Sequence, residues 1–209
     1  MKSLAKFWSL GFLVMLVATS GCVTFVAKPE DMSDVYDKPT IIGAPTIIIT
    51  NLSDKRRDTK LVGRISALNL ATEAPVNVII TNRIASKLRD AGFNIQKAEL
   101  TGFESKSDRI AVLKRKGGKM LFTGSLDHFY IASSDAVLEA AKGRVSFRVD
   151  ILDDRGNSLF YKTYTVHTEK HLGLDGGPGS EKLIEETIQT TVNKLFRDTE
   201  FQQFLSKAK

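Results

Sequence analysis

Residues 144–168, RVSFRVDILDDRGNSLFYKTYTVHT, predict the centre of the fold. Every second residue of the first half is apolar: Val145, Phe147, Val149 and Ile151. This alternation is typical of a strand with one buried face. The turn-forming run 153–157 predicts a hairpin connection, and residues 159–168 return as the partner strand. We therefore expect an antiparallel strand pair that buries one of its faces.

Further strands are expected before this hairpin. Residues 45–52 (PTIIITNL) and 119–132 (KMLFTGSLDHFYIA) have the β-branched and apolar composition of strands. Residues 61–74 suggest a second short strand and a loop. Residues 134–143 contain good helix formers but lie between two strands, so either structure is open there, and we favour a strand from about Val137.

Two helices are indicated strongly by a four-residue apolar period. The first covers residues 75–91, with Pro75 at its first position and a short strand after it at residues 93–95. Its apolar stripe consists of Val76, Ile80, Ile84, Leu88 and Ala91. The second covers residues 180–197, with Ser180 as its cap. Shorter helices are expected at 105–116 and 198–205.

This order of elements predicts an α+β fold. We expect a two-layer sandwich in which a mostly antiparallel sheet is packed by two main helices. The chain has 209 residues, which is long enough for one substantial core. We assign residues 44–209 to a single domain.

The N-terminus has the pattern of a secretion signal. Lys2 and Lys6 precede a mostly apolar run at residues 7–18, and the small residues Thr19-Ser20-Gly21 follow it. The apolar run is shorter than the roughly 20 residues that a membrane-spanning helix requires. Residues 1–21 are therefore predicted to be a cleaved signal peptide.

Cys22 is the single cysteine of the chain and directly follows this segment. It cannot form an internal disulfide. The sequence Thr19-Ser20-Gly21-Cys22 resembles the bacterial lipobox, which implies that Cys22 is acylated and becomes the new N-terminus. Insertion of an acyl chain such as palmitate into the bilayer is favourable by about 0.8 kcal/mol for each buried CH₂ group. An Asp directly after the cysteine would resemble the inner-membrane retention signal of enteric bacteria. Because Val23 stands there instead, we expect the protein on the periplasmic face of the outer membrane.

Residues 22–43 are interpreted as the lipidated cysteine and an extended tether. They contain Pro29, Pro39 and little periodicity. The alternative is an extended segment packed along the domain, in which Ile41 and Ile42 pair as an edge strand.

The charge balance is mildly basic. The chain carries 30 basic and 24 acidic residues, a net charge of +6, and loss of Lys2 and Lys6 with the signal peptide reduces it to +4. This value suits contact with anionic envelope surfaces and does not indicate a nucleic-acid partner.

Two basic clusters form a possible binding surface. Its residues are Asp54, Arg56, Asp58, Lys114, Arg115, Lys116 and Lys119. Such clusters suit phosphate-bearing lipid headgroups, lipopolysaccharide or an acidic protein. The alternative is a solvated surface, on which Asp54 and Asp58 pair locally with the cations between them.

Candidate catalytic chemistry is sparse. His167 and His171 are four residues apart at the end of a strand, where this spacing does not bring them together, so we expect no metal site. The glycine-rich run at 173–181 lacks the Gly-Lys-Ser/Thr ending of a phosphate-binding loop. The sequence contains no Gly-x-Ser-x-Gly motif. We expect a protein that is not an enzyme and needs no cofactor.

The order of segments resembles the YajG-like bacterial lipoproteins. The resemblance rests on four sequence features: Asp54-x-Arg56-x-Asp58 after a strand, the helix end at 84–92, the Gly156-Asn157 hairpin and the closing segment from Val192 to Leu205. The resemblance implies an outer-membrane-anchored domain that faces the periplasm, and it supplies no catalytic residues.

We therefore expect a lipid-anchored binding or accessory module that acts through contacts with other envelope proteins. The alternative is a periplasmic domain that binds a lipid or a cell-wall fragment. That function would require an apolar pocket between the sheet and the helices.

Overall fold

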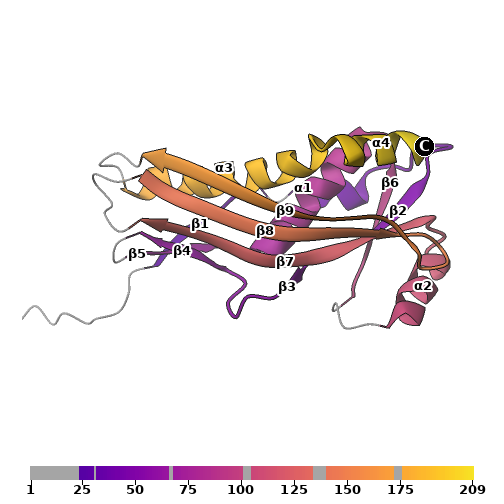
Figure 1. Cartoon of the computed structure of the whole chain (residues 1–209), viewed down its shortest axis with the longest axis horizontal. Helices are drawn as coiled ribbons and strands as arrows, with labels where there is room; N and C mark the ends of the chain where they lie inside the picture. Colours follow the sequence, from indigo (N-terminus) through magenta and orange to yellow (C-terminus); the bar gives the residue numbers. More distant parts are fainter. Residues whose placement is uncertain (1–23, 31, 66–67, 101–104, 134–139, 172–175) are drawn as a thin grey trace, which may run out of the picture.

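The computed structural model describes residues 24–30, 32–65, 68–100, 105–133, 140–171 and 176–209. Within these ranges nine strands form one mixed sheet (Figure 1): β1 (Thr24–Ala27), β2 (Thr46–Thr50), β3 (Ser53–Asp54), β4 (Leu61–Ile65), β5 (Leu68–Thr72), β6 (Asn94–Ala98), β7 (Met120–Ser133), β8 (Ala140–Leu152) and β9 (Ser158–His171). The helices are η1 (Ser33–Asp37, 3-10), α1 (Val76–Asp90), α2 (Lys106–Arg115), α3 (Gly176–Phe196) and α4 (Thr199–Lys207).

The long strand β7 connects two groups of short strands. One edge of β7 pairs antiparallel with β8, which pairs antiparallel with β9. The other edge pairs in parallel with β2, β3 and β4 in turn. Beyond them, β6 pairs with β2, and β5 and β1 extend from β4. The α+β class is confirmed: the longest pairings are antiparallel, as expected, while most of the short strands join through parallel pairs.

The main core lies between the sheet and the layer formed by α1, α3 and α4. The predicted stripe of α1 is buried there, and Ile80, Ile84 and Leu88 have no exposed surface. Strand β2 contributes to both faces, because Ile47 and Ile49 face this core while Ile48 belongs to a small cluster with Leu113 of α2. Helix α2 therefore lies on the opposite face and covers one end of the sheet.

Local signals set the ends of three helices. Helix α1 stops where Gly92 adopts φ +92°, and the Phe93 N–H reaches back to the Leu88 carbonyl. Helix α2 starts with a capping box between Ser105 and Asp108. Helix α4 is separate from α3, as expected, because Asp198 accepts a hydrogen bond from the Phe201 N–H.

The start of α3 differs from the prediction. The helix begins at Gly176 rather than at Ser180, and Ser180 is completely buried inside it instead of capping it. Pro178 falls in the first turn, where the missing N–H has no helical acceptor. The rest of the predicted glycine-rich loop, residues 172–175, lies outside the described residues.

Part of the segment interpreted as a tether packs along the domain, as the alternative proposed, while residues 37–43 are exposed. Strand β1 pairs in parallel with β5, and Ala27 and Val35 are each 1% exposed. The expected edge strand does not form, because residues 41 and 42 lie in a turn and Ile42 is fully exposed. Burial of these apolar side chains makes the packed arrangement favourable.

Some of the predicted features lie outside the described residues. These are the signal peptide, Cys22 and residues 134–139, so the expected strand start near Val137 is described only from Ala140 onward. In the described part of the chain, no helix has both the length and the apolar composition needed to span a membrane.

Candidate functional site

The face of β7, β8 and β9 opposite to α1 and α3 is polar, and we call it the open face. Strand alternation places these side chains on it: Ser125, His128, Tyr130, Arg144, Arg148 and Tyr161. Two of them are exposed aromatic residues, with Tyr161 59% and Tyr130 39% exposed. Arginine and tyrosine together are typical of binding surfaces.

Arg56 and Asp54, named as part of a possible binding surface, form a largely buried ion pair, which is the local pairing that the alternative proposed. The Arg56 Nη2 lies 2.6 Å from Asp54 Oδ2, and the two side chains are 11% and 3% exposed. The guanidinium also donates to the carbonyls of Leu61 (2.9 Å) and Thr59 (2.7 Å) and lies over the Phe129 ring. With its donors engaged inside the protein, Arg56 fixes the 55–61 loop to β7 and is not available to a ligand.

Asp58 stabilises the turn that leads into β4. Its carboxylate accepts hydrogen bonds from the N–H groups of Leu61 (3.1 Å) and Lys60 (3.0 Å). These backbone donors hold the pKa of Asp58 below its ordinary value, because they stabilise the ionised form. Asp58 remains exposed at the surface, as predicted, but its first role is to shape the loop.

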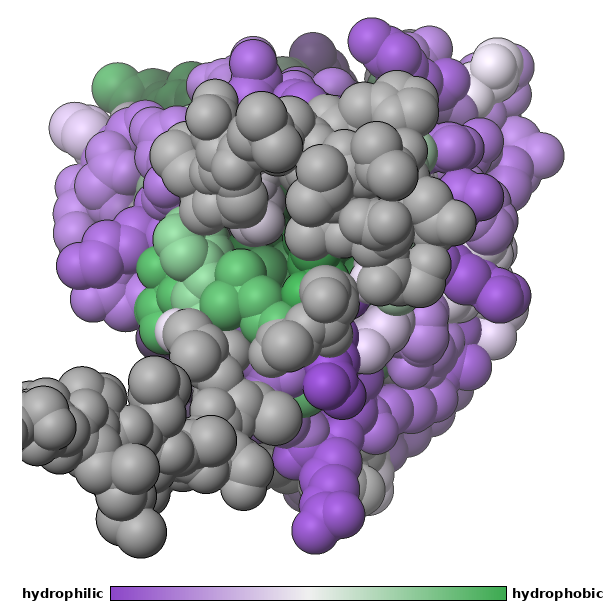
Figure 2. All heavy atoms as spheres, turned by 90° about the vertical axis from the view of Figure 1, so that its left-hand side faces the viewer, coloured by the Kyte–Doolittle hydropathy of each residue, from purple (hydrophilic) through white to green (hydrophobic). Residues whose placement is uncertain are grey.

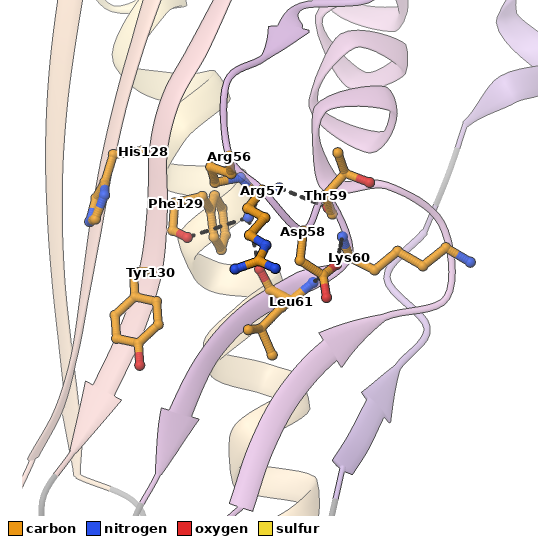
Figure 3. A pocket seen from close by; sticks show the side chains of 9 residues that line it. All are labelled: Arg56, Arg57, Asp58, Thr59, Lys60, Leu61, His128, Phe129 and Tyr130. Atoms are coloured by element: carbon orange, nitrogen blue, oxygen red, sulfur yellow. Dashed lines mark hydrogen bonds between the residues drawn. The ribbon is translucent and has the colours of Figure 1, made fainter.

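The 55–61 loop and β7 line a solvent-open pocket of about 790 Å³ on the open face (Figure 3). Its lining residues are Arg56, Arg57, Asp58, Thr59, Lys60, Leu61, His128, Phe129 and Tyr130. The guanidinium of Arg57 projects into the space between Leu61 and β7, whereas the Lys60 side chain points away from β7. Arg57 is exposed, in contrast to its neighbour Arg56. The pocket therefore combines an accessible cation with aromatic and apolar walls.

His128 lines this pocket, and its pKa depends on burial and on the charges around it. Burial lowers its pKa below the ordinary value of 6.5, and the charges of Arg144 and Arg56 lower the pKa further. Both arginines are cations that disfavour a protonated imidazole. The charge of Arg144, on the neighbouring strand β8, would likewise attract an anionic ligand.

Replacing Arg144 with glutamine is expected to raise the pKa of His128 without restoring 6.5, because burial and Arg56 remain. An NMR titration of the imidazole resonances, assigned with a His128→Gln variant, measures this change. Arg155→Gln is the matched control, since Arg155 lies in the distant β8–β9 turn and should leave the pKa of His128 unchanged. An unchanged pKa in Arg144→Gln would show that the Arg144 charge does not reach the pocket.

A second pocket of about 270 Å³ lies farther along the open face. Arg148 is oriented there by Ser125 Oγ, 3.1 Å from its Nη2, and lies 6.0 Å from the Tyr161 ring centroid. Lys55 lines the same pocket and pairs with Asp127 at 2.9 Å. Lys55 belongs to one of the two basic clusters noted in the sequence, whereas Ser125, Arg148 and Tyr161 were not predicted as site residues, although the alternation of β8 placed Arg148 on the polar face.

The other predicted basic cluster lies elsewhere. Lys114, Arg115 and Lys116 end α2, and Lys119 precedes β7. Nine residues of β7 separate Met120 from Phe129, about 30 Å at 3.3 Å per residue, so the structure does not bring the two clusters together. At the C-terminus of α2 these cations interact favourably with the helix dipole, which gives them a local structural role.

The open face presents polar and aromatic side chains without a metal-binding cluster in the described part of the chain. Among the described residues, no three His, Cys, Asp or Glu side chains gather in a way that could hold a metal ion. His167 and His171 both lie on β9, at its end, as expected. The pockets offer cations, hydroxyl groups and aromatic rings, which suit recognition of an anionic group.

The core between the sheet and helices α1 and α3 is filled by side chains. Phe122, Phe129 and Phe147 of the sheet and Ile188 of α3 are each at most 1% exposed and belong to one continuous cluster. The apolar interior pocket that a lipid-binding or cell-wall-binding domain would require is therefore not formed by these residues, and both pockets described above lie on the open face.

Comparison with protein-family models and with curated proteins gives no match. Among solved structures, the chain is similar to protein XCC0632 from Xanthomonas campestris, described as DUF330, with 9% identity, 83% of this chain and 91% of that chain covered, and a TM-score of 0.50. PelC from Paraburkholderia phytofirmans, a dodecamer, has 12% identity, coverage of 72% and 89%, and a TM-score of 0.43. Lipoprotein GNA1162 from Neisseria meningitidis has 12% identity, coverage of 74% and 99%, and a TM-score of 0.44.

The similarity to XCC0632 shows a shared fold across most of both chains. At 9% identity it does not extend to function. The more specific resemblance to YajG-like lipoproteins rests on the sequence motifs alone.

Proposed function

We propose that this protein is a lipid-anchored component of the bacterial envelope that faces the periplasm. Acylated Cys22 holds it on the inner face of the outer membrane, and the domain acts as a non-enzymatic binding or accessory module through contacts with other envelope proteins. The lipobox-like sequence before Cys22 supports the anchor.

The open face is the observation that carries the binding role. It consists of three long, paired strands, so its side chains are presented on a rigid surface. Tyr161 and Tyr130 are exposed among arginines, and helix α2 covers only one end of this face. Exposed aromatic and arginine side chains are the residues that most often dominate the energy of protein interfaces.

Site-specific photo-crosslinking in a bacterial host tests this proposal. A photoreactive residue in place of Tyr161 in the full chain is expected to give discrete protein adducts, while the same residue in place of Lys194, exposed on α3, should give none. Cys22→Ser should abolish labelling by a palmitate analogue and release the protein from the membrane fraction. Equal adducts from both positions, or none from position 161, would contradict a binding role for the open face.

A further inference from the structure

The pocket lined by Arg57 lies close to the predicted lipid anchor. Leu61 of the pocket pairs with Ala71, and Ala71 pairs with Val26 of β1. At about 4.8 Å per strand, Leu61 and Val26 are roughly 10 Å apart. Cys22 precedes Val26 by four residues, which span at most about 14 Å. The chain length therefore allows at most about 25 Å between Cys22 and the pocket edge.

The end of the molecule that carries β1, β4 and β5 presents apolar surface. Figure 2 shows apolar side chains at the centre of this end, and hydrophilic side chains adjoin them on one side. Val26 of β1 is itself 50% exposed. Exposed apolar side chains such as this one are suited to the interface of a bilayer.

Within the described residues, the pocket has cations that no acidic side chain neutralises through an ion pair. Asp54 neutralises Arg56, as described above, but no ion pair of Arg57 or Lys60 is found within the described residues, nor of Arg144, which lies outside the lining on the neighbouring strand β8. Asp58 is the acidic residue of the lining, and its carboxylate is already engaged by two backbone donors. The accessible charge of the pocket is therefore positive on balance.

The shape of the pocket suits a headgroup with an apolar neighbour. Its volume of about 790 Å³ is in the range of small-molecule sites. Leu61 and the ring of Tyr130 provide apolar contact beside the Arg57 guanidinium. A guanidinium can donate two parallel hydrogen bonds to phosphate oxygens, which an ammonium group cannot do.

We propose that this pocket binds the phosphate group of an anionic lipid headgroup in the membrane that holds the protein, with Arg57 as the donor to the phosphate oxygens. The choice of a membrane lipid as the source of the phosphate rests on the proposed anchoring through Cys22. Lys60 and Arg144 add attraction at longer range.

His128 provides a spectroscopic reporter inside the pocket. The charged groups around it are Arg144 on β8, Arg56, Arg57, Asp58 and Lys60 on the loop, and Asp127 beside it on β7. A bound phosphate adds negative charge, which favours the protonated imidazole. Occupation of the pocket should therefore raise the pKa of His128.

The experiment uses the chain from residue 22 onward with Cys22→Ser, which retains every described residue but no acyl chain. Binding is measured by flotation with zwitterionic phosphatidylcholine vesicles, and with the same vesicles containing phosphatidylglycerol. Soluble glycerol phosphate forms a third arm, and the pKa of His128 is followed by NMR. Because no anchor is present, the result is independent of whether Cys22 is lipidated in cells.

We expect binding to the anionic vesicles, with a raised pKa of His128. Arg57→Gln should weaken this binding about fivefold, the effect of one cation near an anionic surface, and Arg155→Gln should not change it. Equal losses in the two variants, or binding that does not depend on phosphatidylglycerol, would overturn the proposal. Binding of glycerol phosphate without binding to vesicles would overturn the membrane source and assign the pocket to a soluble phosphate.

Discussion

Replacing Arg56 with alanine is expected to lower the free energy of unfolding by about 3–5 kcal/mol, the usual cost of leaving one member of a buried ion pair alone. The variant leaves the Asp54 carboxylate, which is 3% exposed, without its cation. It also removes the donors for the carbonyls of Thr59 and Leu61. Urea denaturation at neutral pH measures the change.

Two further variants make this result specific. Arg57→Ala removes the neighbouring exposed cation and should change stability by no more than about 0.5 kcal/mol. The double variant Asp54→Ala, Arg56→Ala should be less destabilised than the sum of the single variants, because the two charges no longer depend on each other. A loss in Arg56→Ala as small as that in Arg57→Ala would show that Arg56 is not held under the loop in solution.

Replacing Arg83 with alanine is expected to lower the free energy of unfolding by about 2–4 kcal/mol. Arg83 is 3% exposed and makes two contacts with Glu185, at 2.5 and 2.7 Å, and two with the Glu30 carbonyl. It therefore joins α1, α3 and the segment between β1 and η1. We expect a smaller loss than in Arg56→Ala, because Glu185 is 39% exposed and water can solvate it.

Hydrogen exchange separates this effect from general destabilisation. The amides of β1 and η1 should lose protection in Arg83→Ala more than those of β8, because the contact with Glu30 is lost. Glu185→Gln serves as the control, since it keeps an acceptor oxygen and leaves the Glu30 contact intact. A greater loss of β1 protection in Glu185→Gln than in Arg83→Ala would contradict this role for Arg83.

The parts of the fold that the sequence predicted correctly are those with a local cause. Alternation from Val145 to Ile151 depends on the two-residue period of a strand, and the end of α1 depends on Gly92. The parallel pairing of β2, β3 and β4 with β7 has no such period, because it joins residues far apart in the chain. The same holds for β1, whose partner β5 lies more than 40 residues later.

The candidate site shows the limit of sequence patterns most clearly. Arg56 and Arg57 are adjacent and have the same local charge environment in the sequence. The approach of Phe129, 73 residues away, buries Arg56 and leaves Arg57 in the pocket. The cluster of cations in the sequence therefore predicted an exposed surface for both residues. Only tertiary packing distinguishes Arg56, which has a structural role, from Arg57, which is accessible.

The position of β1 also determines how the domain would carry mechanical load. Because β1 begins two residues after Cys22 and pairs in parallel with β5, a pull on the lipid proposed for Cys22 would act along the strand. The hydrogen bonds between β1 and β5 then resist in shear and must break together, whereas a flexible tether would simply extend. A partner that pulls on the open face would therefore transmit force through β1 to the proposed membrane anchor.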